Sequence, residues 1–268
     1  MKGLAVFLVV ALLIVGSLYA FGAFSEDSWW NRDKDGGTLR TEQKTVGRGQ
    51  ALSADVTIDQ AVGSLDVRGG ASSLMEAEFK YDRDSWKPIV DFVLSGTEGR
   101  LSVRQPKNSV TGVIGNVHND WSIVFNQEIP MTMDVTVGAG DSNIDLSDLQ
   151  VTTLAVQTGA SDTEIKGSPS TMRSIDVKAG VGKVVLDLTG DWKQDVAVQV
   201  RGGVGSVELI VPRSVGTVLD VQRGLGGVTA TGFEKSGNIY SNSSYGTTST
   251  TIRIDVSVGV GSVSITQR

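Results

Sequence analysis

The stretch I-D-V-K-A-G-V-G-K-V-V-L, from Ile175 to Leu186, decides the fold. Apolar and polar residues alternate up to two glycines and then alternate again, which is typical of two short strands joined by a bend. Val177 and Val184 can then face one interior while the residues between face water. Glycine at the bend indicates a place where a Cβ atom does not fit, because φ is positive or because a neighbouring coil approaches closely.

The same pattern recurs along the chain as an internal repeat. Its second small residue lies at positions 140, 161, 182, 205 and 226, spaced by 21, 21, 23 and 21 residues, and again at position 261 after 35. A unit of about 21 residues cannot bury its own apolar edge, so successive units must stack. A weaker copy runs from Val56 to Val67.

The repeat predicts an all-β fold, a single-stranded, β-helix-like β-solenoid with repeats of about 21 residues. An antiparallel sandwich is the alternative for short alternating strands, but it does not explain the regular spacing. The predicted interior includes one residue from each unit: Ile58, Val135, Val156, Val177, Val200, Val221 and Val256.

An almost unbroken apolar run from Leu4 to Phe24 precedes the repeats. At about 1.5 Å per residue, a helix of this length crosses the hydrocarbon core of roughly 30 Å. We expect residues 1–24 to be one transmembrane anchor, with a cleaved signal peptide as the alternative. The expected location is the cell membrane, as a single-pass protein, or outside the cell if the segment is removed.

The orientation of this anchor rests on two opposed signals. Arg32, Lys34 and Arg40 outnumber Lys2, which favours a body on the cytoplasmic side. A short N-terminal tail followed by one hydrophobic segment instead behaves as a signal anchor. We expect an extracytoplasmic C-terminal domain.

The rest of the chain divides by composition. Residues 25–50 are polar and rich in glycine, and they are expected to be a flexible juxtamembrane linker. Residues 51–130 are expected to form a less regular β region, and residues 131–268 the glycine-pair solenoid.

The linker contains a candidate calcium loop. Its oxygen ligands follow the spacing of an EF-hand loop, with a glycine at the sixth position. Thr38 stands where that loop prefers an aliphatic residue, and neither flank has the pattern of an amphipathic helix. Calcium is the one cofactor considered, with ligands Asn31, Asp33, Asp35 and Glu42.

Composition excludes several classes of site and partner. The 268 residues include no cysteine and one histidine, His118, so a cysteine-ligated zinc site, a thiol nucleophile and disulfides are absent. The net charge of −6 argues against nucleic-acid binding. It also argues against direct binding of an anionic wall polymer or lipid without a bridging cation.

The candidates for catalysis are few. Asp82 and Asp84 are two apart on a strand-like segment and could act as paired carboxylates in glycoside hydrolysis. Exposed polar residues on a strand are the commoner explanation. Tryptophans that could stack on sugars lie beside β-type alternation or turns, where core roles are expected: Trp86, Trp121 and Trp192.

Three blocks resemble a known family. They are A-E-F-K-Y-D-R-D-S-W-K-P from Ala77 to Pro88, G-R-L-S-V-R-Q-P from Gly99 to Pro106, and N-D-W-S-I-V-F-N-Q-E-I-P from Asn119 to Pro130, running into the glycine-pair repeats. Together they are similar to the toast-rack proteins of the bacterial envelope and to an adhesin-like domain with the same repeats. The resemblance covers roughly residues 50–268 and implies a β-solenoid-like fold without known catalytic residues.

Similar domains end the multi-spanning membrane proteins that restrain cell-wall-stress signalling, whereas this chain has one hydrophobic span. We therefore expect a non-enzymatic, membrane-anchored envelope module that binds a protein partner, in envelope stress or as a structural element. A wall polymer is a further possible ligand. The alternative function is a β-helix enzyme that binds or processes cell-wall polysaccharide.

Overall fold

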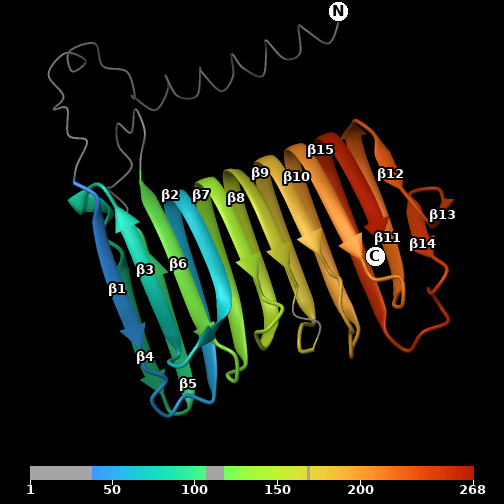
Figure 1. The fold of residues 1–268 in the computed structure, drawn as a ribbon. Coiled ribbons are helices and arrows are strands. Elements are labelled where there is room, and N and C mark those ends of the chain that lie inside the picture. The colour runs from blue at the N-terminus through green and yellow to red at the C-terminus, as the bar shows by residue number, and fades with distance from the viewer. Residues whose placement is uncertain (1–37, 107–117, 168–169) are drawn as a thin grey trace, which may run out of the picture.

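Figure 1 shows the computed structural model of the chain, which describes residues 38–106, 118–167 and 170–268. The apolar run and the first half of the expected linker, residues 25–37, lie outside these residues. No helix within the described ranges combines the length and the apolar character needed to cross a membrane.

The body is a stack of long bent strands. Each runs along one face, curls over at its glycines and returns along the other face, so that one strand supplies two arms of a coil, here called a rung (Figure 1). Neighbouring rungs pair in parallel along both arms. The unsplit rungs are β2 (Ser53–Ala71), β7 (Met131–Asp145), β8 (Val151–Lys166), β9 (Ser174–Asp187), β10 (Val196–Val211) and β15 (Thr251–Gln267).

Glycine is required at the bend for both of the expected reasons. Gly140 and Gly205 have φ of 130° and 145°, a region that L side chains avoid. A Cβ atom on Gly205 would lie 1.8 Å from the carbonyl oxygen of Gly182 on the next rung. The close approach of successive bends therefore excludes a side chain at these positions.

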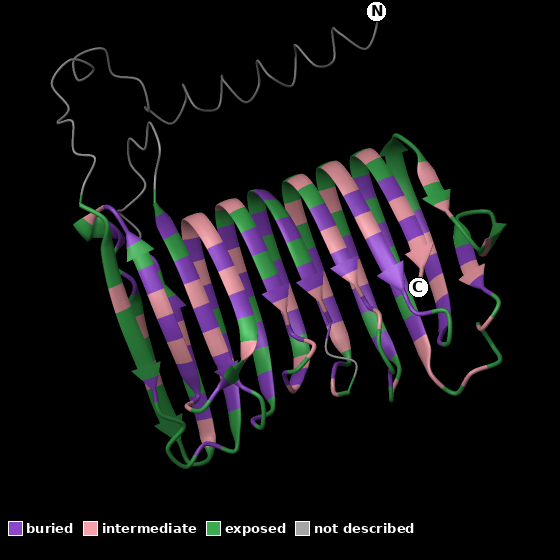
Figure 2. Ribbon diagram, in the orientation of Figure 1, coloured by how far each residue is buried: buried purple, intermediate pink, exposed green. Residues whose placement is uncertain are grey.

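The seven residues predicted to face the interior form one continuous column. Register pairs them rung to rung, and Val103 of β5 (Glu98–Arg104) extends the column at one end. All are at most 4% exposed. Figure 2 shows the resulting alternation of buried and exposed residues along every rung. Each buried aliphatic side chain contributes on the order of 1.5–3 kcal/mol, so the repeated column is the main stabilising element.

The rungs do not stack in the order of the sequence, contrary to the expectation that successive units are neighbours. β15 lies between β10 and β11 (Gly216–Leu225), so the last repeat is inserted one place inside the end of the stack. β12 (Val228–Ala230) completes the outermost rung by pairing with the second arm of β15. The antiparallel strands β14 (Ile239–Asn242) and β13 (Phe233–Ser236) then cover the exposed edge of β11.

At the opposite end of the stack, too, a rung is inserted out of sequence order. β2 lies between β7 and a split rung formed by β5 and β6 (Asn119–Asn126). Antiparallel strands extend both arms beyond it: β3 (Met75–Tyr81) and β1 (Arg40–Val46) next to β6, and β4 (Ile89–Ser95) next to β5. Antiparallel strands thus end both arms of the stack at one end and the β11 arm at the other, which breaks the parallel template for further stacking there.

Part of the expected linker is therefore a strand. β1 lies within residues 25–50 and pairs along its whole length with β3. Its residues are polar on both faces except for Val46, because the pairing depends on backbone hydrogen bonds rather than on burial. A composition-based reading cannot detect an edge strand of this kind.

Buried side-chain amides form hydrogen bonds with the backbone at the bend of β2, next to the split rung. Oε1 of Gln105 accepts hydrogen bonds from the backbone N–H groups of Ala61 and Val62, at 2.9 and 3.2 Å. Nδ2 of Asn119 donates to the same oxygen and to the carbonyl of Val62, while Nε2 of Gln60 donates to the carbonyl of Asn119. Side chains thus complete the hydrogen bonds of the bend.

Candidate functional site

The bends of successive rungs form one edge of the molecule, here called the apex ridge. The residue between the two small positions of each rung stands on this edge, and register aligns these residues from rung to rung. In stacking order they are Val62, Ala139, Ala160, Val181, Val204, Val260 and Leu225.

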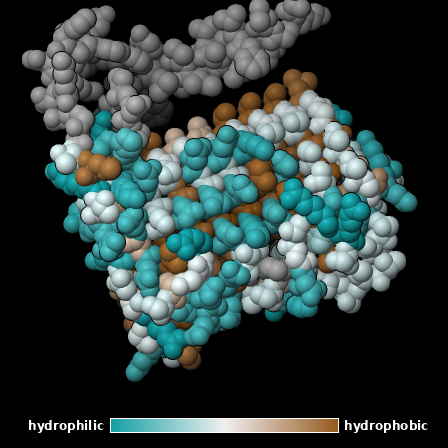
Figure 3. All heavy atoms as spheres, in the orientation of Figure 1, coloured by the Kyte–Doolittle hydropathy of each residue, from teal (hydrophilic) through white to brown (hydrophobic). Residues whose placement is uncertain are grey.

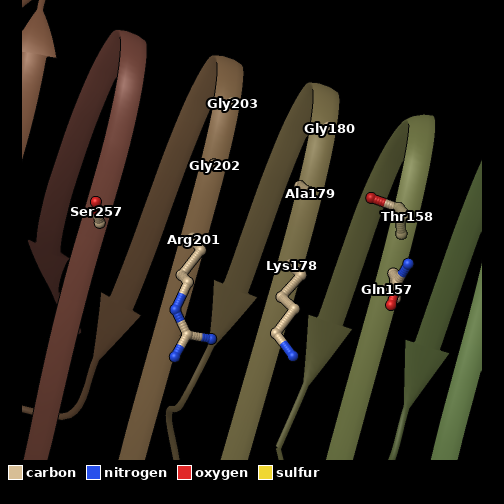
Figure 4. Close-up of a pocket in the computed structure, with 9 residues that line it drawn as sticks. All are labelled: Gln157, Thr158, Lys178, Ala179, Gly180, Arg201, Gly202, Gly203 and Ser257. Carbon is tan, nitrogen blue, oxygen red and sulfur yellow. The ribbon is translucent and has the colours of Figure 1, made fainter.

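A shallow groove of about 410 Å³ runs across the outer face of the first arms, beside the C-terminal half of the apex ridge. Its polar side chains form a row across β8, β9, β10 and β15, because Gln157, Lys178, Arg201 and Ser257 are in register (Figure 4). Small residues, including Ala179 and Gly202, form its floor. We call it the basic groove.

The cations of the basic groove share one carboxylate. Nη1 of Arg201 lies 3.0 Å from Oδ1 of Asp176, and Nζ of Lys178 lies 3.6 Å from Oδ2. The three side chains are between 36% and 55% exposed, so the ion pairs are screened and contribute little to stability. The groove therefore offers donors that can exchange Asp176 for another anionic or polar group.

A second groove, of about 430 Å³, lies on the outer face of the second arms in the N-terminal half of the stack. Its lining includes Asp66, Asp141, Asp162 and Glu164, with Lys183 at one end. Across the described ranges, no three histidine or carboxylate side chains are grouped so that they could hold a metal ion. The two grooves thus have opposite charge and lie on opposite arms of the stack, and they share rungs β8 and β9.

The candidate calcium loop is divided by the boundary of the described residues. Asn31, Asp33 and Asp35 lie outside them, and Glu42 lies on β1. Oε2 of Glu42 accepts a hydrogen bond from the Tyr81 hydroxyl at 3.1 Å and lies 3.2 Å from Nζ of Lys87. Burial, followed by this hydrogen bond, raises the pKa of Tyr81. A calcium ligand at Glu42 would have to exchange both contacts.

The structure does not pair the two carboxylates considered for glycoside hydrolysis. Asp82 is 8% exposed and accepts a hydrogen bond from the backbone N–H of His118 at 3.2 Å. Asp84 opens the short 3₁₀ helix Asp84–Trp86, is exposed, and lies 3.0 Å from Nη1 of Arg40. Each carboxylate is held by a separate structural partner, and His118 contributes its backbone rather than its imidazole.

The three tryptophans considered for sugar stacking are core residues. Trp86, Trp121 and Trp192 are at most 3% exposed. Nε1 of Trp121 donates to Asn119, and Nε1 of Trp192 donates to the carbonyl of Leu188. Their faces are therefore covered by the protein.

Sequence reasoning used the glycine pairs for the fold and overlooked the residues around them. The apex ridge and the basic groove both come from positions next to these glycines. Comparing the repeats position by position would have found them: Ala139 and Ala160 precede Val181, Val204 and Leu225 along the chain.

The chain is similar to proteins of known family. Residues 35–170 match the family model described as the N-terminal domain of toast_rack, DUF2154, which is half of the chain. Residues 159–265 match the model described as cell wall-active antibiotics response LiaF, C-terminal. A search of curated proteins finds no match.

One solved structure shows the same fold. A candidate cell adhesion protein from Clostridium sporogenes is 31% identical with a TM-score of 0.68, and the alignment covers 86% of this chain and 100% of that one. A candidate adhesin from Bacteroides fragilis is 12% identical with a TM-score of 0.33, covering 86% and 98%. The family model over half the chain and the Clostridium structure together establish that this protein belongs to the toast-rack family.

Proposed function

We propose that this protein is a non-enzymatic, membrane-anchored module of the bacterial cell envelope, which acts in the response to cell-wall stress by binding a protein partner through the outer face of its rungs. The match of residues 159–265 to a domain named for the response to cell wall-active antibiotics is the observation that carries this proposal. The basic groove lies within those residues, apart from Gln157 and Thr158 at its edge.

The shape of the described body supports binding rather than catalysis. In-register rungs present rows of side chains along an extended face, which suits recognition of another macromolecule. The basic groove holds donors and no paired carboxylates. It can therefore bind a carboxylate-bearing segment of a partner, but it has no acid and base with which to cleave one.

Membrane anchoring through residues 4–24 is part of this proposal. The full chain should stay with the membrane fraction in carbonate and high salt and should dissolve in detergent. A C-terminal tag should be accessible to protease added to intact cells if the body is extracytoplasmic. Recovery of a mature protein that begins near residues 21–24 would instead support a secreted protein.

A cellular experiment tests the binding role. A cell-wall-stress reporter is followed during antibiotic treatment in cells that lack the protein and in cells complemented with variants. We expect deletion to change the response, and the double variant Lys178→Glu/Arg201→Glu to behave like the deletion. Arg100→Glu is the matched control, because Arg100 is an exposed cation on β5 at the other end of the stack.

Crosslinking identifies the partner in the same cells. A photoreactive residue in place of Gln157, at the edge of the basic groove, should capture an envelope protein, and the charge-reversed variant should lose this product. Equal reporter responses in all strains would contradict the proposal. The proposal would also be contradicted if the purified protein turned over a cell-wall glycan and lost this activity on Asp82→Asn or Asp84→Asn.

A further inference from the structure

The C-terminal half of the apex ridge is a continuous row of exposed aliphatic side chains. Val181, Val204, Val260 and Leu225 are in register on β9, β10, β15 and β11, and they are 47%, 41%, 45% and 64% exposed. With strands about 4.8 Å apart, the row extends over roughly 14 Å. Figure 3 shows hydrophobic residues in brown along this upper edge of the body. Single exposed aliphatic residues are ordinary, but an ordered row indicates an interaction surface.

Cations lie closest to this row. In the sequence, Lys178 is three residues and Lys183 two residues from Val181. Arg201 is three residues from Val204, and Arg223 is two residues from Leu225. Asp220 and Asp255 are the nearest anions on β11 and β15, each five residues from the ridge. On β9 and β10 the nearest anions are Asp176 and Glu208, five and four residues from it. They pair with the same cations at 3.0–3.6 Å. Asp162 on the neighbouring rung accepts a hydrogen bond from the backbone N–H of Lys183 at 2.7 Å.

The other half of the apex ridge has the opposite character. On β7 and β8 the ridge residues are Ala139 and Ala160, and Asp141 and Asp162 follow them at the position held by lysine, serine or glycine in the C-terminal rungs. On β2, at the end of this half, Val62 and Ser64 occupy these two positions. Aliphatic side chains therefore stand on the ridge of all four C-terminal rungs, and cations flank it on three of them, β9, β10 and β11. This coincidence points to a partner surface that is itself apolar beneath an anionic layer.

The chain enters the described body at the level of the ridge. Arg40, the first residue of β1, pairs with Tyr81, which pairs with Asn119. Asp120 in turn pairs with Ser64, the residue after the bend glycine Gly63. In Figure 1, β1 accordingly starts at the edge where the rungs curl over. Residues 25–39 can reach at most about 50 Å, so the anchor proposed at residues 4–24 keeps the start of β1 within that distance of the bilayer.

We propose that the C-terminal half of the apex ridge rests on the surface of an anionic lipid bilayer. The four aliphatic side chains enter the boundary between headgroups and acyl chains, and the flanking lysines and arginines bind lipid phosphates. In Figure 4 the side chains of Lys178 and Arg201 extend away from the glycines of the bend. Both cations pair with the Asp176 carboxylate, so contact with phosphate exchanges an exposed ion pair. The inference rests on the anchoring proposed above. Lys178 and Arg201 also line the proposed partner site, and the nanodisc experiment below tests their contact with lipid separately because no partner is present.

A second copy of the chain fits this surface less well. Two ridges packed in the same direction would join the aliphatic rows but would place Lys178 and Arg201 against their own counterparts. Two ridges packed in opposite directions would pair basic with acidic rungs but would set Val204 against alanine and aspartate. A lipid surface satisfies the apolar row and the cations together.

Because the chain has no cysteine, one introduced thiol can report contact with lipid. The full chain carrying Val204→Cys is labelled with an environment-sensitive fluorophore and placed, one copy per disc, in lipid nanodiscs of phosphatidylcholine with or without phosphatidylglycerol. Some of the lipids carry a quencher near the headgroup end of the acyl chain. Ala160→Cys is the matched control, because it occupies the same ridge position in the acidic half. Thermal melts confirm that each labelled variant is folded.

We expect the Val204→Cys label to lose more than about half of its emission in anionic discs, and the Ala160→Cys label to change little. High salt, or Lys178→Gln together with Arg201→Gln, should reduce the loss at Val204→Cys. Equal quenching of both labels, or none at Val204→Cys, would overturn the ridge contact. Carbonate extraction of the same samples distinguishes this from failure of the anchor, since an anchored chain with an unquenched label refutes the ridge contact alone.

Discussion

The two halves of the stack use one backbone design for different surfaces. Rungs β7 and β8 place alanine on the apex ridge, aspartate beside it and hydroxyl groups beneath it, whereas rungs β9, β10 and β15 place valine on the ridge and valine beneath it. The inward columns run through both halves, and neighbouring rungs from β7 to β15 keep the same register on both sides of the bend. The fold therefore depends on positions that all rungs share, and the surface chemistry depends on the few positions next to the bend.

Rung β8 illustrates how far the bend tolerates a change. Ser161 stands where the neighbouring rungs have Gly140 and Gly182, and no non-glycine residue in the described ranges has a positive φ. Pairing with β9 is accordingly interrupted after Ala160, and Oδ1 of Asp162 accepts the N–H of Lys183 at 2.7 Å instead. A side chain at the bend is thus accommodated by a local change of path and a substitute hydrogen bond.

The largest expected effect concerns the buried column of side chains that both halves share. Val200→Asp places an unpaired charge in the continuous column and should destabilise the protein by at least about 4 kcal/mol. Val135→Asp, in the other half, should have a similar effect. Urea unfolding of the full chain in detergent, followed by the fluorescence of the buried tryptophans, measures both. Ala197→Asp is the control, because Ala197 is exposed on the same strand as Val200. A small effect of either column variant would mean that the halves are not one core.

The second-largest expected effect tests whether the two halves differ in their need for glycine at the bend. Gly205→Ala introduces a Cβ atom 1.8 Å from the carbonyl oxygen of Gly182, at a φ of 145°, and should destabilise the protein by about 3 kcal/mol or more. Ser161→Ala should lose only the hydroxyl contacts, about 1 kcal/mol. Gly227→Ala, with open space at its Cβ and no positive φ, controls for the loss of glycine. Similar midpoints for Gly205→Ala and Ser161→Ala would contradict the requirement for glycine.

Most of the fold was predictable from the sequence for a physical reason. A column residue such as Val177 is fixed by alternation within its own unit and by repetition in the next, so two independent signals agree. The position of β15 was not predictable in this way. Its inward residues would fit beside β10 or beyond β11 equally well, since neighbouring rungs present nearly the same surface. The spacing of 35 residues before Gly261 is the one sequence feature that marks the insertion.

The candidate site was less predictable. Net charge is a sum over the whole chain, and the value of −6 conceals the separation of Asp141 and Asp162 from Lys178 and Arg201. That separation becomes a surface property only when register places the rungs side by side. Asp82 and Asp84 show that closeness in the sequence does not make two carboxylates a pair in the fold, since each has a different structural partner.

A smaller effect concerns the hydroxyl groups beneath the N-terminal half of the ridge. Oγ1 of Thr163 lies 3.0 Å from Oγ of Ser142 and 3.1 Å from Oγ of Ser161, and all three residues are at most 4% exposed. Thr163→Val should destabilise the protein by about 1–2 kcal/mol, because it leaves buried hydroxyl groups with fewer partners.

The double variant Ser142→Val/Thr163→Val sharpens this test. It gives the N-terminal rungs the aliphatic residues found at Val184 and Val207 in the same column, and it should recover part of the loss. The difference between double and single variants in urea unfolding gives the coupling. Strictly additive losses would show that the hydroxyl groups do not act as a cluster.

The smallest effect is a pH dependence confined to the C-terminal half. Asp195 accepts the N–H of Thr251 at 2.8 Å and pairs with Arg253 at 3.0 Å, which ties the inserted strand β15 to the start of β10. The Thr251 N–H, and then the Arg253 hydrogen bond, lower the pKa of Asp195. Since the folded pKa lies below the unfolded value of about 3.9, the stabilisation is present above that pH and disappears as pH falls through the folded pKa. Its size is below about 1 kcal/mol, because the pair is more than half exposed.

Asp195→Asn should therefore lower the urea midpoint slightly near neutral pH and not at all in strong acid, where the wild-type carboxylate is protonated. Asp255→Asn is the control, because Asp255 is exposed on β15 and has no ion pair among residues 38–106, 118–167 and 170–268. A constant difference between Asp195→Asn and wild type across this pH range would assign the loss to packing. A difference that disappears as pH falls would show that a charged contact holds the inserted rung β15 in place. In the N-terminal half, where β2 is inserted between β7 and the split rung, neutral amides have this role.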